Sequence, residues 1–207
     1  ISERLKSNSF ISSNNDNIIQ KKEIEPKYQL INSKKNFEKI LSEIERKGIC
    51  AIDTETNSLN IEKAKLVGIS ICYSKNISYY IPINHTTLDG LKKIDNQLEE
   101  NYVINHINKI CKNESILKIG QNIKYDIRIL NKYGVTFNSI ADTMLISYSI
   151  DNGIFKHNLD DLSFNHLNHT TIKYKEVVGT GKNEITFDKV TIDNAINYAA
   201  EDSLLTF

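Results

Sequence analysis

Two carboxylates stand two residues apart in the stretch Ile52-Asp53-Thr54-Glu55. In an extended chain, residues i and i+2 face the same way, so Asp53 and Glu55 project together. Adjacent carboxylates repel each other unless a cation lies between them, and Mg²⁺ and Mn²⁺ prefer such oxygen ligands. The pair therefore predicts a divalent-metal site, although a D-x-E pair taken alone more often marks a strand end whose acids point into water.

Two more acidic motifs follow later in the chain. Asn122-Ile123-Lys124-Tyr125-Asp126 opens an expected helix after Gly120, where an acid can simply offset the helix dipole. In Tyr198-Ala199-Ala200-Glu201-Asp202, Tyr198 and Asp202 share one helical face, one turn apart. The two alanines would allow close approach to a neighbour, and Glu201 lies on another face, so it is left out of the site. Neither motif is specific on its own.

The elements that must position these acids follow from the spacing of the apolar residues. Helices are expected over residues 35–46, 102–111, 122–133, 143–150, 159–167 and from about 191 onward, and strands over 50–52, 66–73, 77–83, 116–119 and 140–141. Gly48 and Gly134 fit helix C-caps, and Pro82 fits a strand end. Three strands, then alternating helix and strand, then helices predict an α/β domain with a mixed sheet and helices on both faces.

Composition limits the remaining possibilities. The chain has 207 residues, 40% of them hydrophobic, and a formal net charge of zero, which argues against a protein held on nucleic acid by bulk charge. No apolar run approaches 18 residues, so no membrane span is expected. Three widely spaced cysteines favour reduced, buried thiols in an intracellular protein. Residues 1–27 are polar and Ser/Asn-rich and are expected to form a linker or tail ahead of a domain spanning 28–207.

In this order, D-x-E after a strand, N-x-x-x-D opening a helix and Y-x-x-x-D on a late helix form a specific combination. With it the chain resembles the DEDD exonucleases with Tyr in the last motif, above all the 3′→5′ proofreading domain of family A DNA polymerases. The likeness runs from about Tyr28 to Phe207 and includes IDTETNSL, LKIGQNIKYDIRILNKYG, ADTMLISYSI, GTGKNEITF and YAAEDSLLT. It implies a ribonuclease H-like fold and hydrolysis at the 3′ ends of DNA.

The resemblance also implies roles for the acids. Asp53 would bridge two divalent ions, Mg²⁺ or Mn²⁺, and Glu55 and Asp202 would complete the site of the ion that activates water. Asp126 would serve the second ion, mostly through water. Tyr198 would hold the attacking water, and the product would be a nucleoside 5′-monophosphate. Two ions supply the nucleophile, the charge neutralisation and the leaving-group assistance that a phosphodiester requires.

Substrate contacts are implied in the same way. Leu59 would wedge near the last bases, Tyr125 and Tyr174 would pack on the terminal nucleotides, and Asn122 would hydrogen-bond near the terminus. Taken alone, Leu59 and Tyr174 are more often core residues. Lys156 stands before His157 where bacterial members carry Arg, and Lys cannot form a bidentate phosphate fork, which weakens the expected phosphate contact.

Several expectations extend beyond the acids. The chain is expected to be a monomeric fragment that acts on single-stranded DNA 3′ ends, with a polymerase domain following Phe207. The alternatives are an RNA-trimming exonuclease of the same superfamily and an inactive structural domain, against which the intact acids argue. The 33 Ile, 25 Asn and 23 Lys fit A/T-rich codons and are similar to the composition of DNA polymerases of the apicoplast, the plastid-like organelle of malaria parasites.

Overall fold

The computed structural model describes residues 26–151 and 156–207. Six strands form one mixed sheet in the order β1-β4-β3-β2-β5-β6. The strands are β1 (Lys27–Leu30), β2 (Ile49–Thr56), β3 (Leu66–Ser74), β4 (Ile77–Pro82), β5 (Leu117–Gly120) and β6 (Ile140–Asp142). The antiparallel β2, β3 and β4 are flanked by parallel pairings of β1 with β4, β5 with β2 and β6 with β5. The α/β fold expected from the sequence is confirmed.

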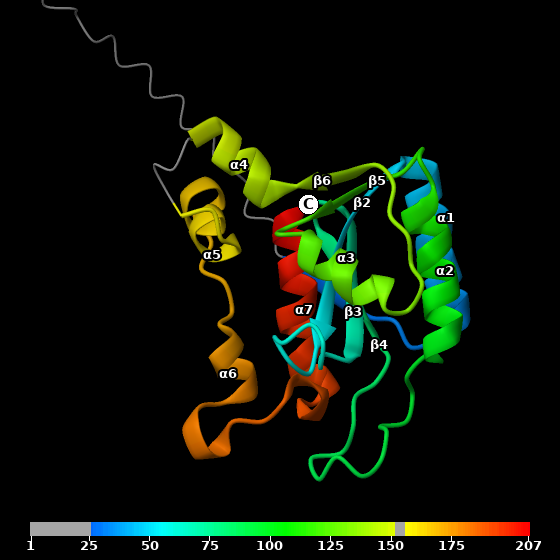
Figure 1. Ribbon diagram of the computed structural model, residues 1–207, viewed down its shortest axis with the longest axis vertical. Coiled ribbons are helices and arrows are strands. Elements are labelled where there is room, and N and C mark those ends of the chain that lie inside the picture. The colour runs from blue at the N-terminus through cyan, green and yellow to red at the C-terminus, as the bar shows by residue number, and fades with distance from the viewer. Residues whose placement is uncertain (1–25, 152–155) are drawn as a thin grey trace, which may run out of the picture.

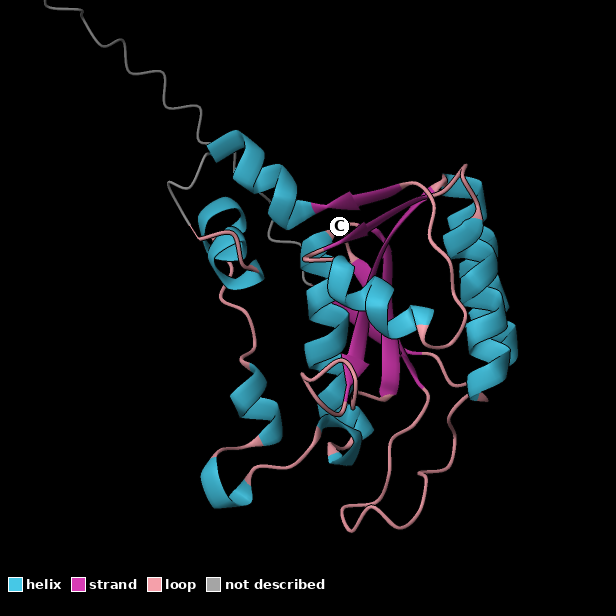
Figure 2. Cartoon of the chain, viewed as in Figure 1, coloured by secondary structure: helices cyan, strands magenta, loops and turns pink. Residues whose placement is uncertain are grey.

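Helices cover both faces of this sheet, as Figures 1 and 2 show. The α-helices are α1 (Lys34–Lys47), α2 (Glu100–Lys112), α3 (Lys124–Asn131), α4 (Thr143–Asp151), α5 (Leu159–Leu162), α6 (Tyr174–Val178) and α7 (Ile192–Thr206). Helices α1 and α2 pack on one face and enclose the larger apolar core, which includes Phe37, Ile44 and Ile107. Helix α7 crosses the other face against β1 to β4, over a smaller core.

Local sequence explains the best-predicted elements. In α1 the buried residues Phe37, Ile40, Leu41 and Ile44 recur at helical spacing, and Gly48 ends the helix in the left-handed conformation at φ 68°. Helix α7 lies close to the sheet because Ala195, Ala199 and Ala200 are fully buried on its inner side. All three cysteines are buried and unpaired, as expected.

Several elements differ from the expectations. Lys27 begins β1, a strand that was not predicted, whereas residues 1–25 of the expected linker lie outside the described residues. Helix α3 starts at Lys124, two residues late, because Asn122 has φ 58°. The helix expected over 159–167 divides into α5 and a π-helical turn at Ser163–Leu167, and the short α6 was not predicted. Within the described ranges, no helix has the length and apolarity needed to cross a membrane.

Candidate active site

The first two acids lie inside strand β2, not after it as the sequence suggested. β2 continues to Thr56, so Asp53 and Glu55 alternate with Thr54 and share one face of the sheet. The pairing with β3 shifts register directly after Glu55, and such irregularities re-aim side chains near functional sites. Gly68 pairs with Glu55, and a Cβ there would meet the Tyr80 hydroxyl at 2.2 Å, so only glycine leaves room for that ring beneath the acids.

Helix α7 brings the third acid to this pair. Carboxylate oxygens of Asp53, Glu55 and Asp202 all lie within 4.8 Å of one another. Tyr198 stands one turn before Asp202 on the same helical face, and burial together with the charge of Asp202 raises the pKa of its hydroxyl. Because β2 is an interior strand that α7 packs against, the three acids meet between this strand and α7, rather than on an edge strand.

The fourth acid, Asp126 of α3, is hydrogen-bonded to Thr54 of β2. The parallel pairing of β2 with β5 ends at Ala51, which leaves later backbone groups of β2 available. Asp126 Oδ1 accepts the Thr54 backbone N–H at 2.9 Å and the Thr54 hydroxyl at 2.6 Å. The residue between the first two acids therefore holds the fourth one near them. Asp126 does not belong to the group of three whose oxygens lie within 4.8 Å.

Crowding of the acids changes their proton affinity. Burial, together with the charges of Asp126, Glu55 and Asp202, raises the pKa of Asp53 well above its usual range, and burial with Asp202 and Asp126 does the same for Glu55. Burial also raises the pKa of Asp126 to about 7 and, with the charge of Glu201, that of Asp202 to about 8. The anionic cluster is therefore strained at neutral pH.

A hard divalent cation fits this cluster. Glu55 Oε1 is buried and has no hydrogen-bond partner among the described residues, although such oxygens are normally satisfied. The ligand atoms are all carboxylate oxygens, which suit Mg²⁺ or Mn²⁺ and not a thiol-seeking metal. A cation would relieve the repulsion and satisfy the unpartnered oxygen at once.

The expected substrate residues fall into two groups. Tyr125 is half-buried and its hydroxyl contacts Thr56 Oγ1 at 2.7 Å, whereas Tyr174 stacks on Phe187 with ring centroids 6.3 Å apart. Leu59 is 85% exposed, so the reading of Leu59 as a core residue is wrong. Burial, and to a lesser degree the charge of Glu55, raises the pKa of both tyrosines, so Tyr125 and Tyr174 lie within electrostatic reach of the acids.

Asn122 and Lys156 are the two remaining residues that were expected to contact the substrate. The backbone N–H of Asn122 donates to Asp142, which also accepts from Ile123 and Met144 and so holds the turns at the starts of α3 and α4. Lys156 is exposed and begins the second described range. Its neighbour His157 is held by Ser147 and by Gln121, at 2.9 and 2.7 Å.

Sequence reasoning missed three residues at this site. Thr54 holds Asp126, Phe187 supports Tyr174 and Tyr198, and Glu201, which had been set aside, is almost fully buried beside Asp202. The Glu201 oxygens are occupied by His169 and Ile172, so this acid is not a free metal ligand. No local pattern links residues so far apart in the chain, and only a pairing signal between distant positions could have found them.

A mixed α/β sheet that carries a cluster of carboxylate oxygens is the arrangement expected of a metal-dependent nuclease. Residues 28–207 match the protein family described as 3′–5′ exonuclease, in the form found in family A DNA polymerases. The chain belongs to this family and is a hydrolytic 3′–5′ exonuclease domain.

Known proteins agree with this assignment. DNA polymerase I of Rhizobium leguminosarum is 41% identical over 77% of this chain and 17% of its own length, and that of Borreliella burgdorferi is 36% identical over 87% and 19%. The chain thus spans about a fifth of these relatives. The structure of Escherichia coli RNase D, an exoribonuclease, is 16% identical and superposes with a TM-score of 0.61 over 86% of this chain and 42% of that one, which shows a shared fold.

Proposed function

We propose that this chain removes nucleoside 5′-monophosphates one at a time from single-stranded or frayed DNA 3′ ends and proofreads for an attached DNA polymerase. The observation that carries the proposal is the convergence of Asp53, Glu55 and Asp202 within 4.8 Å. Support for DNA and for an attached polymerase comes from the curated relatives, which are DNA polymerases I.

We also propose that two divalent ions serve this site. Asp53, Glu55 and Asp202 would hold one of them, and Asp53 with Asp126 would serve the second. When bound, Mg²⁺ or Mn²⁺ supplies an activated water and neutralises charge on the phosphate and the leaving oxygen. The unpartnered Glu55 Oε1 supports this ligand set.

The chain's own groups would orient the reactants. Tyr198, whose hydroxyl keeps its proton because burial and nearby acids raise its pKa, would donate one hydrogen bond to Asp202 and position the attacking water. Exposed Leu59 and the rings of Tyr125 and Tyr174 would hold the last bases apart from a duplex, in a way that accepts any base. Asn122 and Lys156 would contact the terminal nucleotide and a phosphate.

The test uses the purified chain with three matched single strands: DNA labelled at the 5′ end, the same DNA blocked at the 3′ end, and RNA of the same sequence. We expect a ladder of products shortened from the 3′ end in Mg²⁺ or Mn²⁺, no cleavage of the blocked strand, and no activity in chelator. Asp202→Asn should be inactive, whereas Asp193→Asn, an exposed acid on the same helix, should behave like wild type. Faster cleavage of RNA would favour the RNA-trimming alternative, and an inert wild type would favour the structural one.

Two expectations about context stay predictions. The chain should act as a monomer, which light scattering during size-exclusion chromatography would test. An intracellular, apicoplast location is supported only by the bias toward Ile, Asn and Lys, since the relatives named above are bacterial. Imaging of the tagged full-length protein would test it.

A further inference from the structure

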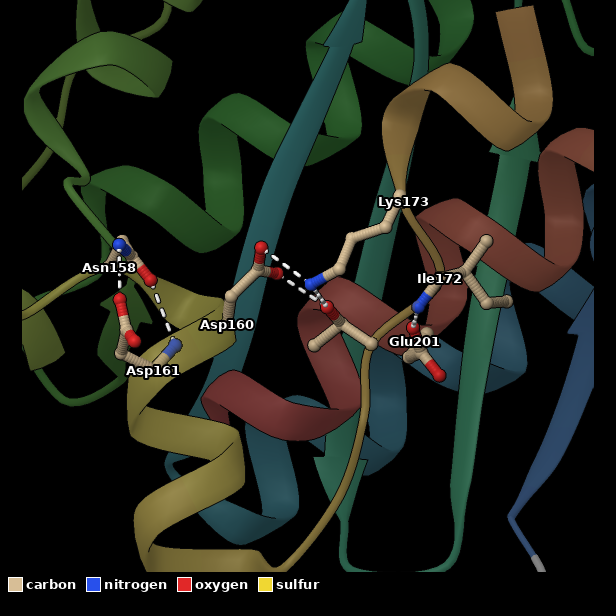
Figure 3. A network of polar contacts seen from close by, with 7 residues as sticks. Asn158, Asp160, Asp161, Ile172, Lys173 and Glu201 are labelled. Carbon is tan, nitrogen blue, oxygen red and sulfur yellow. Dashed lines mark hydrogen bonds and ion pairs between the residues drawn. The ribbon is translucent and has the colours of Figure 1, made fainter.

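Glu201 binds a segment of chain that has no regular secondary structure of its own. Its Oε1 accepts His169 Nε2 at 2.8 Å, and its Oε2 accepts the Ile172 backbone N–H at 2.7 Å. The side chain is only 4% exposed, so these charge-assisted bonds form away from competing water. Residues 168–173 have no regular secondary structure, and Figure 3 shows this stretch passing over α7 with the backbone nitrogen of Ile172 facing Glu201.

A second acid holds the same segment from the opposite side. Asp160 of α5 forms an ion pair with Lys173 at 2.7 Å and accepts the Thr171 hydroxyl, and Lys173 also contacts Thr171 at 3.0 Å (Figure 3). Asp160 and Lys173 are about half exposed, so this pair is screened by water and contributes less than a buried one. Glu201 is therefore the stronger of the two attachments.

The segment leads directly into Tyr174, the first residue of α6. The Tyr174 ring stacks on Phe187 and lies 6.0 Å from the Tyr198 ring, edge to face. Tyr198 and Glu201 are both on α7, three residues apart. Helix α7 thus carries both Asp202, a proposed metal ligand, and Glu201, which binds the segment just ahead of Tyr174.

We propose that Glu201 is a positioning residue that sets Tyr174 against the 3′-terminal nucleotide. This inference rests on the proposed function, in which Tyr174 packs on that nucleotide. Glu201 acts through residues 169–172 and touches neither metal nor substrate, because protein donors occupy both of its oxygens. Because Glu201 and Asp202 are adjacent on α7, this helix fixes the position of Tyr174 relative to the acid cluster.

A double-mutant cycle separates this role from a general structural one. We expect Glu201→Ala to raise the KM for a single-stranded DNA oligonucleotide by roughly tenfold, within the effect of losing one stacked base, while kcat changes little. Tyr174→Ala should have a similar effect, and the double variant should be no worse than Tyr174→Ala, because both changes remove the same contact. Glu201→Gln, which keeps an acceptor for the Ile172 N–H, should recover part of the loss. Asp193→Ala on the same helix is the control.

Two further measurements distinguish a loss of positioning from damage to the metal site. Stabilisation by Mn²⁺ should be the same in Glu201→Ala as in wild type, because the metal ligands remain. Amide hydrogen exchange at residues 172–174 should rise in that variant. If Glu201→Ala does not fold, His169→Ala removes one of the two bonds at a part-exposed site and should give a smaller rise in KM.

Additive effects of Glu201→Ala and Tyr174→Ala, a fall in kcat at constant KM, or a lost Mn²⁺ response would overturn the positioning role. Unchanged exchange at residues 172–174 would do so as well. An inert wild type would instead overturn the proposed function, and because exchange does not depend on activity, the two failures are distinguishable.

Discussion

The two sides of the molecule differ in how well their apolar residues are packed. In the sheet and its covering helices, large side chains such as Ile69 and Ile71 are at most 1% exposed. In α4, by contrast, Leu145 is 62% and Ile150 74% exposed, and Ser147 is its only buried residue. Figure 1 shows α4, α5 and α6 beside the sheet and not over its centre.

The two parts also carry different residues of the proposed site. The acids lie on β2, α3 and α7, in the well-packed part, where a metal site needs ligands fixed to a fraction of an ångström. In the proposed function, Tyr174 and Lys156 contact a substrate strand that must enter, shift by one nucleotide and leave, and both lie outside the sheet and its covering helices, on α6 and just before α5. Four predictions, from the largest effect to the smallest, test the packed part and its contrast with α4.

The largest effect is expected from Asp53→Asn. Because this acid is central to the cluster, its loss should lower kcat on single-stranded DNA by roughly 10³-fold or more, as expected when several kcal/mol of charge stabilisation by metal are removed. Tyr198→Phe should keep partial activity, because it disturbs water placement and leaves the carboxylates intact. Single-turnover rates in Mg²⁺ measure both. Wild-type rates for Asp53→Asn would show that the chemistry does not depend on the packed part.

The next effect compares two isoleucines. Ile69→Ala, in β3, should lower the free energy of unfolding by about 2–5 kcal/mol because it leaves a cavity in the core. Ile150→Ala, in α4, should change it by less than about 0.5 kcal/mol because the side chain is already in water. Urea unfolding of the two variants gives both values. Equal losses would show that α4 is packed against something in solution and that the two parts of the molecule do not differ in packing.

A third prediction concerns pH and the buried His85. This ring is held as a neutral tautomer: Nδ1–H donates to the Val190 carbonyl at 3.0 Å, and Nε2 accepts the Tyr80 hydroxyl at 2.7 Å. Burial lowers the pKa of His85 from 6.5 to about 4, although Val190 and Asp188 oppose the shift. Between these values the unfolded chain binds the extra proton, so stability falls as pH drops, by about 3 kcal/mol in total.

The measurement is urea unfolding in chelator from pH 7 to pH 4.5, for wild type and His85→Asn. The variant should be less stable at pH 7 yet show a flatter decline toward acid. Taking the difference between the two proteins cancels the opposite contribution of the acid cluster, whose raised pKa values make the metal-free fold less stable as pH rises. Parallel pH curves would mean that the pKa of His85 is the same in the folded and the unfolded chain.

The smallest effect is the response to metal. Mn²⁺ at about 100 times its Kd should add about 2.7 kcal/mol of stability. For a domain of this size, that raises Tm by roughly 5–10 °C. In chelator, Asp53→Asn should melt above wild type because one repelling charge is gone, yet gain little from Mn²⁺. Calorimetry in chelator and in Mn²⁺ measures both expected changes in Tm. A variant that is less stable in chelator but shows a full metal shift would make Asp53 a structural acceptor and not a ligand.

Sequence alone determined the features that depend on local spacing. The apolar period of α1 predicted 35–46 against the observed Lys34–Lys47, and alternation along β2 predicted that Asp53 and Glu55 share a face. Helical spacing likewise placed Tyr198 and Asp202 together on α7. These predictions succeeded because a repeat of 3.6 or 2 residues is a property of the chain itself.

Only the tertiary structure decided which distant residues meet. Strand β1 has four residues and exists through its pairing with β4, fifty positions along the chain, so its own sequence carries no strong signal. The bond from Thr54 to Asp126 spans 72 residues, and the bond from His169 to Glu201 spans 32. Such contacts form because folding brings unpaired donors and acceptors together where water is excluded, and each must then find a partner. Thus residue types and local spacing set the available ligands, and packing set which of them share one site.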